Sequence, residues 1–321
     1  TWDSEKQEWV IEEVDKWIYE STSLEKFQDE NLHKQIWEIY VSLTPRQILE
    51  ELDTFMIDTS DGWFLAYVWN CFDEVEVGCG PPDASNTEWL VAFDPLAIAP
   101  TSGDREALYN PGKVKDALET NYLKGTIIHE NAHIMSLSAS QSDGDMTDWT
   151  ELCDRSDDGS LDWEECDETK IRQTFLQKEF VCKPNYYTTE GCFKEDSYLN
   201  LFFQKFWTDI YPVEFFAGDK TISHDVFFNK YHDRFVSIYA STNVEEDFAE
   251  SFSAFVLWDD GMIDDYNSAC EKESRISWKD WNPTPEIGDG WVLTDQNLWF
   301  NCPKSYPDNS IWEEKIRFFY D

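Results

Sequence analysis

Apolar residues recur every three or four positions in several parts of the chain, which is the spacing of one face of an α-helix. We therefore predict helices over residues 5–20, 31–43, 44–56, 110–138, 170–180, 243–258 and 310–320. In the third of these, Thr44 is expected to cap the helix and Pro45 to occupy its first position.

Two shorter stretches have a different pattern. Residues 62–70 (GWFLAYVWN) and 87–95 (TEWLVAFDP) are runs of aromatic and branched side chains bounded by Gly, Pro, Asn or Asp. Such runs predict β-strands. Residues 182–235 are rich in aromatic side chains, but they follow no clear period and predict no particular element.

Helices together with a few strands indicate an α+β fold. The chain contains no repeat, no low-complexity tract and no linker rich in Pro, Gly or Ser. We therefore expect one domain over 1–321, with an insertion at 138–235 and a loop-rich C-terminal extension at 259–321. Hydrophobic residues make up 41% of the chain, enough for a sizeable core.

Charge changes the picture of possible partners. There are 66 acidic and 25 basic residues, a formal net charge of -41. This surface repels phosphate backbones and anionic membranes, so nucleic acid is excluded as a partner, whereas cations and basic peptides are favoured. Solubility or a salty environment explains the same charge equally well. No apolar run reaches the roughly 20 residues of a membrane span.

The eight cysteines fall into close couples without any CxxC motif. This spacing disfavours a zinc ribbon or a thioredoxin-like pair and favours local disulfides between successive cysteines. Disulfides imply an oxidising compartment, so we expect a secreted protein. The start at Thr1, instead of Met, fits a processed chain. The expected pairs are Cys71 and Cys79, Cys153 and Cys166, Cys182 and Cys192, and Cys270 and Cys302.

Residues 125–137 (GTIIHENAHIMSL) contain an HExxH motif. On a helix, His129 and His133 lie one above the other and can direct two imidazoles at one metal ion. Glu130 lies roughly 100° further round, where it can act as a general base toward a water molecule. The alternative is a buried helix with two incidental histidines.

A catalytic zinc ion needs a third protein ligand. His33, His224 and His232 are candidates, but none falls in a short downstream pattern with the motif. Glu246 is the stronger candidate, because it lies one helical turn from Glu250 on the same face. The alternative is a solvated pair of glutamates.

The helix that carries Glu246 also has a predicted start and a predicted core face. Thr242 and Glu245 form a capping box, which would place Glu246 in the first turn. Ala249 and Ser253 are small enough to allow close approach to the histidine helix. A separate apolar stripe consists of Phe248, Phe252 and Phe255.

Together, HENAH at 129–133 and Tyr239, Asn243, Glu246 and Glu250 resemble the gluzincin metallopeptidases. Within that family the motifs resemble those of the catalytic domain of anthrax lethal factor and of secreted Pro-Pro endopeptidases. The resemblance covers 125–137 and 239–257, and the segment between the motifs is longer here than in those relatives. It therefore implies no substrate specificity.

The resemblance implies a zincin-like fold and a set of residue roles. The implied zinc ligands are His129, His133 and Glu246. Tyr239 would face the site and donate a hydrogen bond to the oxyanion of the reaction. Glu250 is expected to orient a ligand histidine. We also expect strand 87–95 to form the sheet edge on which an extended peptide pairs.

Residues 154–165 (DRSDDGSLDWEE) match a twelve-residue EF-hand loop, with Gly159 at the sharp turn. Cys153 and Cys166 bracket this loop. The alternative is an Asp-rich surface loop. The expected calcium ligands are Asp154, Ser156, Asp158, Ser160, Asp162 and Glu165.

These features predict a secreted zinc-dependent endopeptidase, acting on a protein or peptide substrate and stabilised by structural Ca2+. Two alternatives remain open. One is an inactive calcium- and protein-binding module on a peptidase scaffold. The other is a metallohydrolase that acts on cell-wall or glycan amides.

Overall fold

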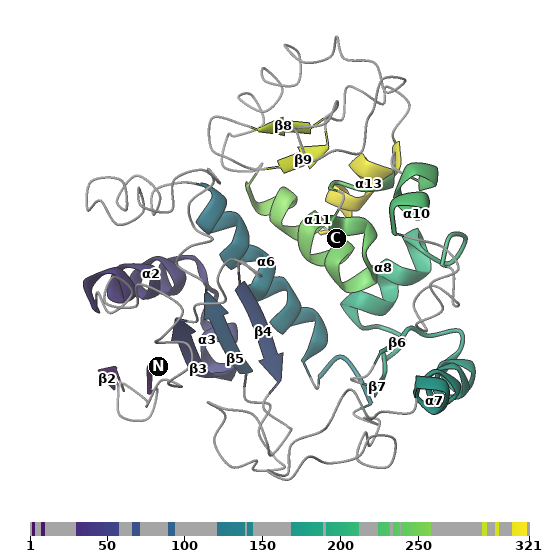
Figure 1. Ribbon diagram of the computed structural model, residues 1–321, viewed down its shortest axis with the longest axis horizontal. Helices are drawn as coiled ribbons and strands as arrows, with labels where there is room; N and C mark the ends of the chain where they lie inside the picture. Colours follow the sequence, from purple (N-terminus) through teal and green to yellow (C-terminus); the bar gives the residue numbers. More distant parts are fainter. Residues whose placement is uncertain are drawn as a thin grey trace. The chain divides into compact units, whose positions relative to one another are not determined.

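A computed structural model describes residues 2–3, 8–9, 30–57, 66–70, 89–93, 121–138, 140–143, 168–188, 191–211, 224–231, 234–237, 239–257, 291–293, 299–301 and 310–319 (Figure 1). The chain divides into two compact units. Unit 1 comprises Thr1–Ile134, Val256–Ala269 and Val292–Trp299, and unit 2 comprises Met135–Phe255, Cys270–Trp291 and Phe300–Asp321.

Unit 1 contains a five-stranded sheet in the order β2-β1-β3-β5-β4. Its strands are β1 (Trp2–Asp3), β2 (Glu8–Trp9), β3 (Leu52–Ile57), β4 (Ala66–Asn70) and β5 (Trp89–Phe93). Strand β5 runs parallel to β3 and antiparallel to β4, and all five of its residues are buried. The two predicted strands are confirmed over 66–70 and 89–93.

The predicted position of strand 87–95 at the sheet edge is wrong. Strand β5 lies between β3 and β4, so both of its sides are hydrogen-bonded within the sheet. Among the described strands, β4 occupies that edge instead. The uninterrupted apolar sequence of β5 is typical of a central strand covered on both faces, which is the physical reason for its place.

Two helix predictions are wrong in part. Residues 8–9 form strand β2 and not a helix, since they pair with β1; the rest of 5–20 lies outside the described residues. The helix predicted over 44–56 is α3 (Arg46–Glu51), and the chain turns extended at Leu52. Residues 52–57 then pair with β5, and this tertiary pairing overrides the helical period.

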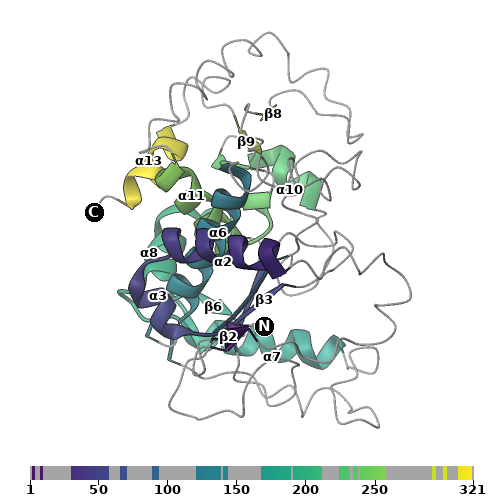
Figure 2. The ribbon, with the colours of Figure 1, turned by 90° about the vertical axis from the view of Figure 1, so that its left-hand side faces the viewer.

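Helices α2 (Glu30–Leu43) and α6 (Asn121–Leu137) confirm their predictions over the described residues. Helix α2 lies beside the sheet (Figures 1 and 2). Aromatic rings make the contact between them. The Tyr40 ring lies 5.4 Å from Phe55 of β3 and 5.8 Å from Phe93 of β5, as measured between ring centroids. These contacts fix α2 against the two central strands.

Unit 2 is mainly helical. Its elements are α7 (Glu168–Cys182), β6 (Tyr187–Thr188), β7 (Gly191–Cys192), α8 (Tyr198–Phe206), α10 (His224–Tyr231), the 3-10 helix η5 (Tyr239–Ser241), α11 (Val244–Leu257) and α13 (Ser310–Phe318). Helices α7, α11 and α13 were predicted. Strands β8 (Trp291–Leu293) and β9 (Trp299–Asn301) form a separate two-stranded sheet.

Aromatic side chains build the core of unit 2. Phe202 of α8 lies near Phe248 of α11 and Phe318 of α13, with ring centroids 5.5 Å apart in both cases. Trp207 stacks on Phe227 at 5.8 Å. The predicted apolar stripe of α11 therefore does serve the core, since Phe248 and Phe252 both also contact Phe319.

The α+β class is confirmed by this mixture of helices and small sheets. Among the described helices, none has the length and apolar character needed to cross a bilayer. The disulfide between Cys182 and Cys192 is confirmed. The other six cysteines and the predicted calcium loop 154–165 lie outside the described residues, and the division into one domain with an insertion stays a prediction.

Candidate metal centre

Helix α6 brings two imidazoles together. His129 and His133 are one turn apart, and their Nε2 atoms are 3.0 Å from each other. Each side chain is 8% exposed. The prediction that both histidines lie on one helix face is confirmed. Two ring nitrogens at this distance can direct their lone pairs to a single metal ion.

The surroundings of α6 hold the histidines in place. Its flanking apolar residues Ile127, Ala132 and Ile134 are fully buried. Between the histidines, the amide of Asn131 donates a hydrogen bond to the Thr44 hydroxyl at 3.0 Å. Thr44 thus contacts α6 and does not cap α3, which has Pro45 at its N-cap and no capping side chain. This buried hydrogen bond fixes α6 to the chain segment before α3.

Glu130 is 5% exposed and lies on the same helix. Burial raises the pKa of the Tyr40 phenol well above its usual range, the nearby Thr44 hydroxyl opposes this rise, and the negative charge of Glu130 adds to it. Tyr40 is therefore within electrostatic reach of Glu130. Sequence reasoning missed this neighbour, because in the sequence Tyr40 is only one more apolar position of α2.

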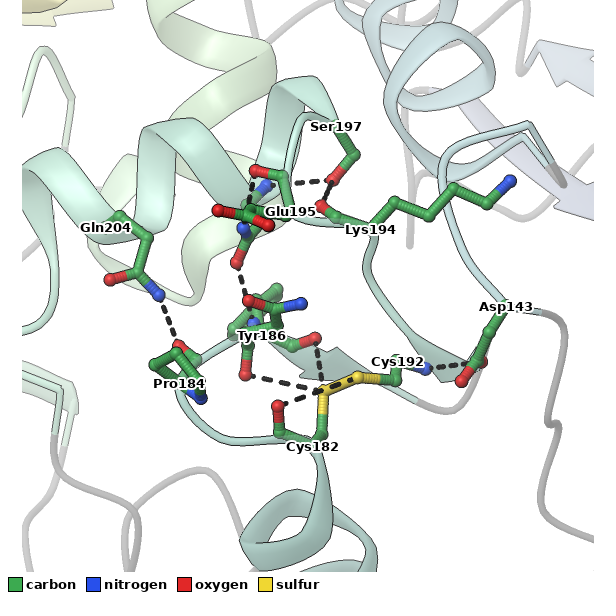
Figure 3. Close-up of a disulfide and its surroundings, with 11 residues drawn as sticks. Asp143, Cys182, Pro184, Tyr186, Cys192, Lys194, Glu195, Ser197 and Gln204 are labelled. Carbon is green, nitrogen blue, oxygen red and sulfur yellow. Dashed lines mark hydrogen bonds between the residues drawn. A yellow bond between two sulfur atoms is a disulfide. The ribbon is translucent and has the colours of Figure 1, made fainter.

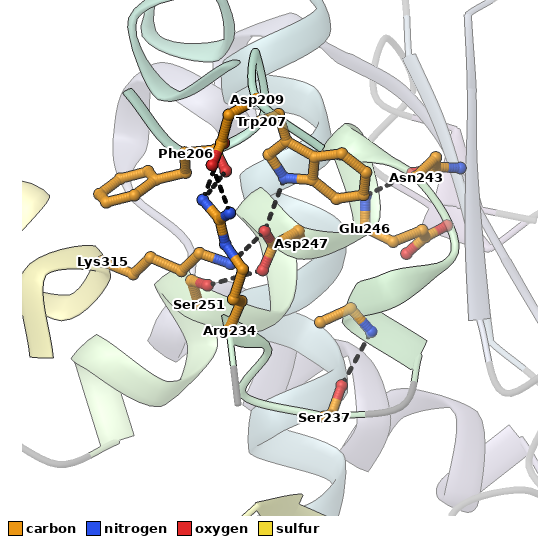
Figure 4. A network of polar contacts seen from close by, with 11 residues as sticks. Phe206, Trp207, Asp209, Arg234, Ser237, Asn243, Glu246, Asp247, Ser251 and Lys315 are labelled. Atoms are coloured by element: carbon orange, nitrogen blue, oxygen red, sulfur yellow. Dashed lines mark hydrogen bonds and ion pairs between the residues drawn. The ribbon is translucent and has the colours of Figure 1, made fainter. Parts of the chain in front are cut away.

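Glu246 lies in the first turn of α11, as predicted, but the predicted capping box is wrong. The Asn243 side chain accepts a hydrogen bond from the Glu246 backbone N–H at 2.7 Å (Figure 4). Asn243 directly precedes the helix and so takes the capping position, one residue after Thr242. Acidic residues in this turn also interact favourably with the helix dipole.

Tyr239 is directly linked to Glu246. Its hydroxyl donates a hydrogen bond to Glu246 Oε1 at 3.0 Å, and its side chain is 51% exposed. The hydroxyl of Ser237 accepts a hydrogen bond from the Ala240 N–H at 2.9 Å, which fixes the 3-10 helix that carries Tyr239. Tyr239 thus lies beside Glu246, and its expected role toward an oxyanion stays a prediction.

His129, His133 and Glu246 are a group of side chains that could hold one metal ion. Two imidazole nitrogens and one carboxylate oxygen are a typical protein donor set for a catalytic zinc ion, with a fourth position left for water or substrate. The residues therefore fit the metal that the motif predicts. Glu250 is half-buried on α11, and its predicted role toward a ligand histidine stays a prediction.

Sequence reasoning missed a buried ion pair beside Glu246. Lys315 Nζ lies 2.5 Å from Asp247 Oδ2, and Trp207 Nε1 donates to the same oxygen at 2.7 Å (Figure 4). Burial raises the pKa of Asp247, and the attraction of Lys315 opposes that rise. In the sequence Lys315 is an ordinary helix residue of α13, and only the fold reveals its partner.

A second network supports the first turn of α11. The disulfide Cys182–Cys192 closes a short loop that contains Tyr186 (Figure 3). The Tyr186 hydroxyl donates to Glu245 Oε2 at 2.9 Å, and its backbone N–H donates to Asn200 Oδ1 at 2.9 Å. The loop is therefore bonded to the residue that precedes Glu246.

Comparisons with known proteins add no relative to this picture. No family model, no curated protein and no solved structure matches the chain.

Proposed function

We propose that the chain is a zinc-dependent endopeptidase with a zincin-like fold of the gluzincin type. The observation that carries this proposal is the buried imidazole pair of His129 and His133, with Nε2 atoms 3.0 Å apart on one helix that also carries Glu130. The carboxylate of Glu246 supports it, since it adds a third ligand atom to a group that could hold one metal ion.

In this proposal His129, His133 and Glu246 hold Zn2+. When bound, zinc supplies Lewis-acid chemistry, by lowering the pKa of water and polarising a peptide carbonyl. Glu130 accepts a proton from the attacking water and passes it to the leaving amine. The buried position of Glu130 suits this role, because few competing water molecules reach it.

Tyr239 completes the set of acting residues. Its hydroxyl is already placed by the hydrogen bond to Glu246 and by the 3-10 helix. We assign it the hydrogen bond to the oxyanion that forms when the peptide carbonyl is attacked. Its half-exposed side chain leaves the phenol accessible to a substrate that comes from solvent.

The sheet offers a place for an extended peptide substrate. Among the described strands, β4 pairs with β5 on one side and forms the edge of the sheet on the other. Main-chain groups at such an edge can pair with an extended peptide. We therefore transfer the proposed substrate contact from β5 to β4.

Calcium and secretion belong to the same proposal. The loop 154–165 would bind Ca2+ through Asp154, Ser156, Asp158, Ser160, Asp162 and Glu165. Helix α7 follows the loop as a second flanking helix would, although its start at Glu168 is late for an EF-hand. The disulfide Cys182–Cys192 is compatible with an extracellular protein.

The test is cleavage of a diverse peptide library by the full-length chain and by Glu130→Gln. We expect the wild type to cleave peptides and a zinc chelator to stop it. Glu130→Gln should retain zinc but lose cleavage by roughly 100-fold or more, because it lacks the general base. Glu50→Gln, which removes a glutamate from the exposed side of α3, is the matched control and should cleave normally.

Two outcomes would contradict the proposal. Full cleavage by Glu130→Gln would refute the assigned base. Zinc binding by the wild type without cleavage of any peptide would favour the alternative of an inactive binding module.

A further inference from the structure

The pair formed by Lys315 and Asp247 is enclosed by unit 2. Lys315 is 1% exposed and Asp247 is fully buried. Three aromatic rings surround the ammonium group, with centroids 4.7 to 5.8 Å from Nζ: those of Phe235, Phe202 and Phe206. A buried side chain stays ionised in such surroundings only when an opposite charge is hydrogen-bonded to it, because desolvation of a lone charge is very costly.

The Asp247 carboxylate is fixed from three directions. Lys315 Nζ and Trp207 Nε1 both bind Oδ2, at 2.5 and 2.7 Å, and the Ser251 hydroxyl donates to Oδ1 at 3.3 Å (Figure 4). These partners come from α13, from the residue that follows α8, and from the next turn of α11. The carboxylate therefore connects three helical segments of unit 2.

Asp247 directly follows Glu246 in the first turn of α11. Successive helix residues are roughly 100° apart around the axis. Anchoring Asp247 toward the core therefore sets the rotation of the turn, and with it the direction in which Glu246 leaves the helix. The Asn243 side chain fixes the backbone N–H of Glu246, and the Tyr239 hydroxyl fixes the Glu246 carboxylate. Neither Asn243 nor Tyr239 is itself buried in the core.

We propose that the buried ion pair between Lys315 and Asp247 positions Glu246 for metal binding, which makes α13 a supporting element of the metal centre. This inference rests on the proposed function. Lys315 and Asp247 are positioning residues that act through the first turn of α11. A single substitution would leave one charge buried alone, so the test needs a variant that removes both charges.

The experiment measures zinc affinity of the full-length chain by competition with a chromophoric chelator, together with the visible spectrum of the Co2+ form. The test variant is Lys315→Met combined with Asp247→Asn, which keeps the side-chain volumes similar. Phe318→Ala is the matched control, since it weakens the packing of α13 on Phe202 and Phe206 without touching Asp247. Urea unfolding establishes that each variant folds.

We expect the double variant to fold, to lose zinc affinity by roughly 10- to 100-fold, and to show an altered Co2+ spectrum. Phe318→Ala should lose stability but keep the affinity and the spectrum of the wild type. Unchanged affinity and spectrum in the double variant would overturn the positioning role alone, as would an equal loss of affinity in Phe318→Ala. Failure of the wild type to bind zinc would instead overturn the proposed function, and the positioning role with it.

Discussion

At the scale of single residues, Tyr239 has the most specific expected effect on catalysis. Removal of one preorganised oxyanion donor costs roughly 100- to 1000-fold in kcat in a serine protease, and we expect a loss of that order for the proposed role of Tyr239. At saturating zinc, Tyr239→Phe should show such a loss in kcat while KM stays close to wild type, since the substrate ground state is unchanged. Steady-state kinetics with one cleavable peptide measures this.

Tyr198→Phe is the matched control, because Tyr198 is a similarly exposed tyrosine of unit 2. It should leave kcat unchanged. A kcat in Tyr239→Phe equal to that of the wild type would remove Tyr239 from the mechanism.

The hydrogen bond between Asn131 and Thr44 gives a second expectation at this scale. Thr44→Val keeps the shape of the side chain but leaves the buried amide of Asn131 without this acceptor. We expect a loss of about 1–3 kcal/mol in the free energy of unfolding. Urea denaturation measures it, with Ser42→Ala, which removes an exposed hydroxyl that bonds the Ile39 carbonyl, as the control of small effect. A loss no larger than that of the control would show that Thr44 does not support α6.

The spacing of residues along a helix predicted which side chains of the proposed metal site lie on the same face. The HExxH positions, and Glu246 with Glu250, follow from the geometry of a helix, whereas Tyr239 was singled out by the resemblance to the gluzincins. Lys315, Asp247 and Tyr40 could not be predicted in the same way. Their partners lie far away in the sequence, and a buried lysine looks identical to an exposed one until the fold is known.

At the scale of elements, the start of α11 provides a direct test of the corrected cap. Asn243→Ala removes the side chain that accepts from the Glu246 N–H and should lower the free energy of unfolding by about 1 kcal/mol. Thr242→Ala should have a clearly smaller effect, because Thr242 precedes the capping position. Chemical denaturation of both variants decides between them, and a larger loss in Thr242→Ala would restore the capping box.

A helix or strand could be predicted where its apolar residues follow a single spacing along the whole element. Helices α2, α11 and α13 were found because each has an apolar face that recurs at helical spacing. Strand β3 was missed because residues 52–57 continue the apolar spacing of α3, whereas pairing with β5 decides their conformation. Two parallel strands that pair, such as β3 and β5, are distant in the sequence. The local spacing of apolar residues therefore contains no information about their pairing.

At the scale of the whole molecule, calcium removal should lower stability. A ligand that binds only the folded state at 100 times its Kd contributes about 2.7 kcal/mol, so its removal should lower the Tm measurably. EGTA should reduce both the Tm and resistance to a test protease, and added Ca2+ should restore them while Mg2+ should not. Identical Tm values with and without EGTA would contradict a structural calcium site.

The most direct test of the central claim is X-ray absorption at the zinc edge of the zinc-loaded full-length chain, together with its zinc stoichiometry. We predict one zinc ion per chain, coordinated by two imidazoles and oxygen without sulfur, and loss of this centre in His133→Ala but not in His33→Ala. Sulfur ligands, no tightly bound zinc, or an unchanged spectrum in His133→Ala would contradict the account.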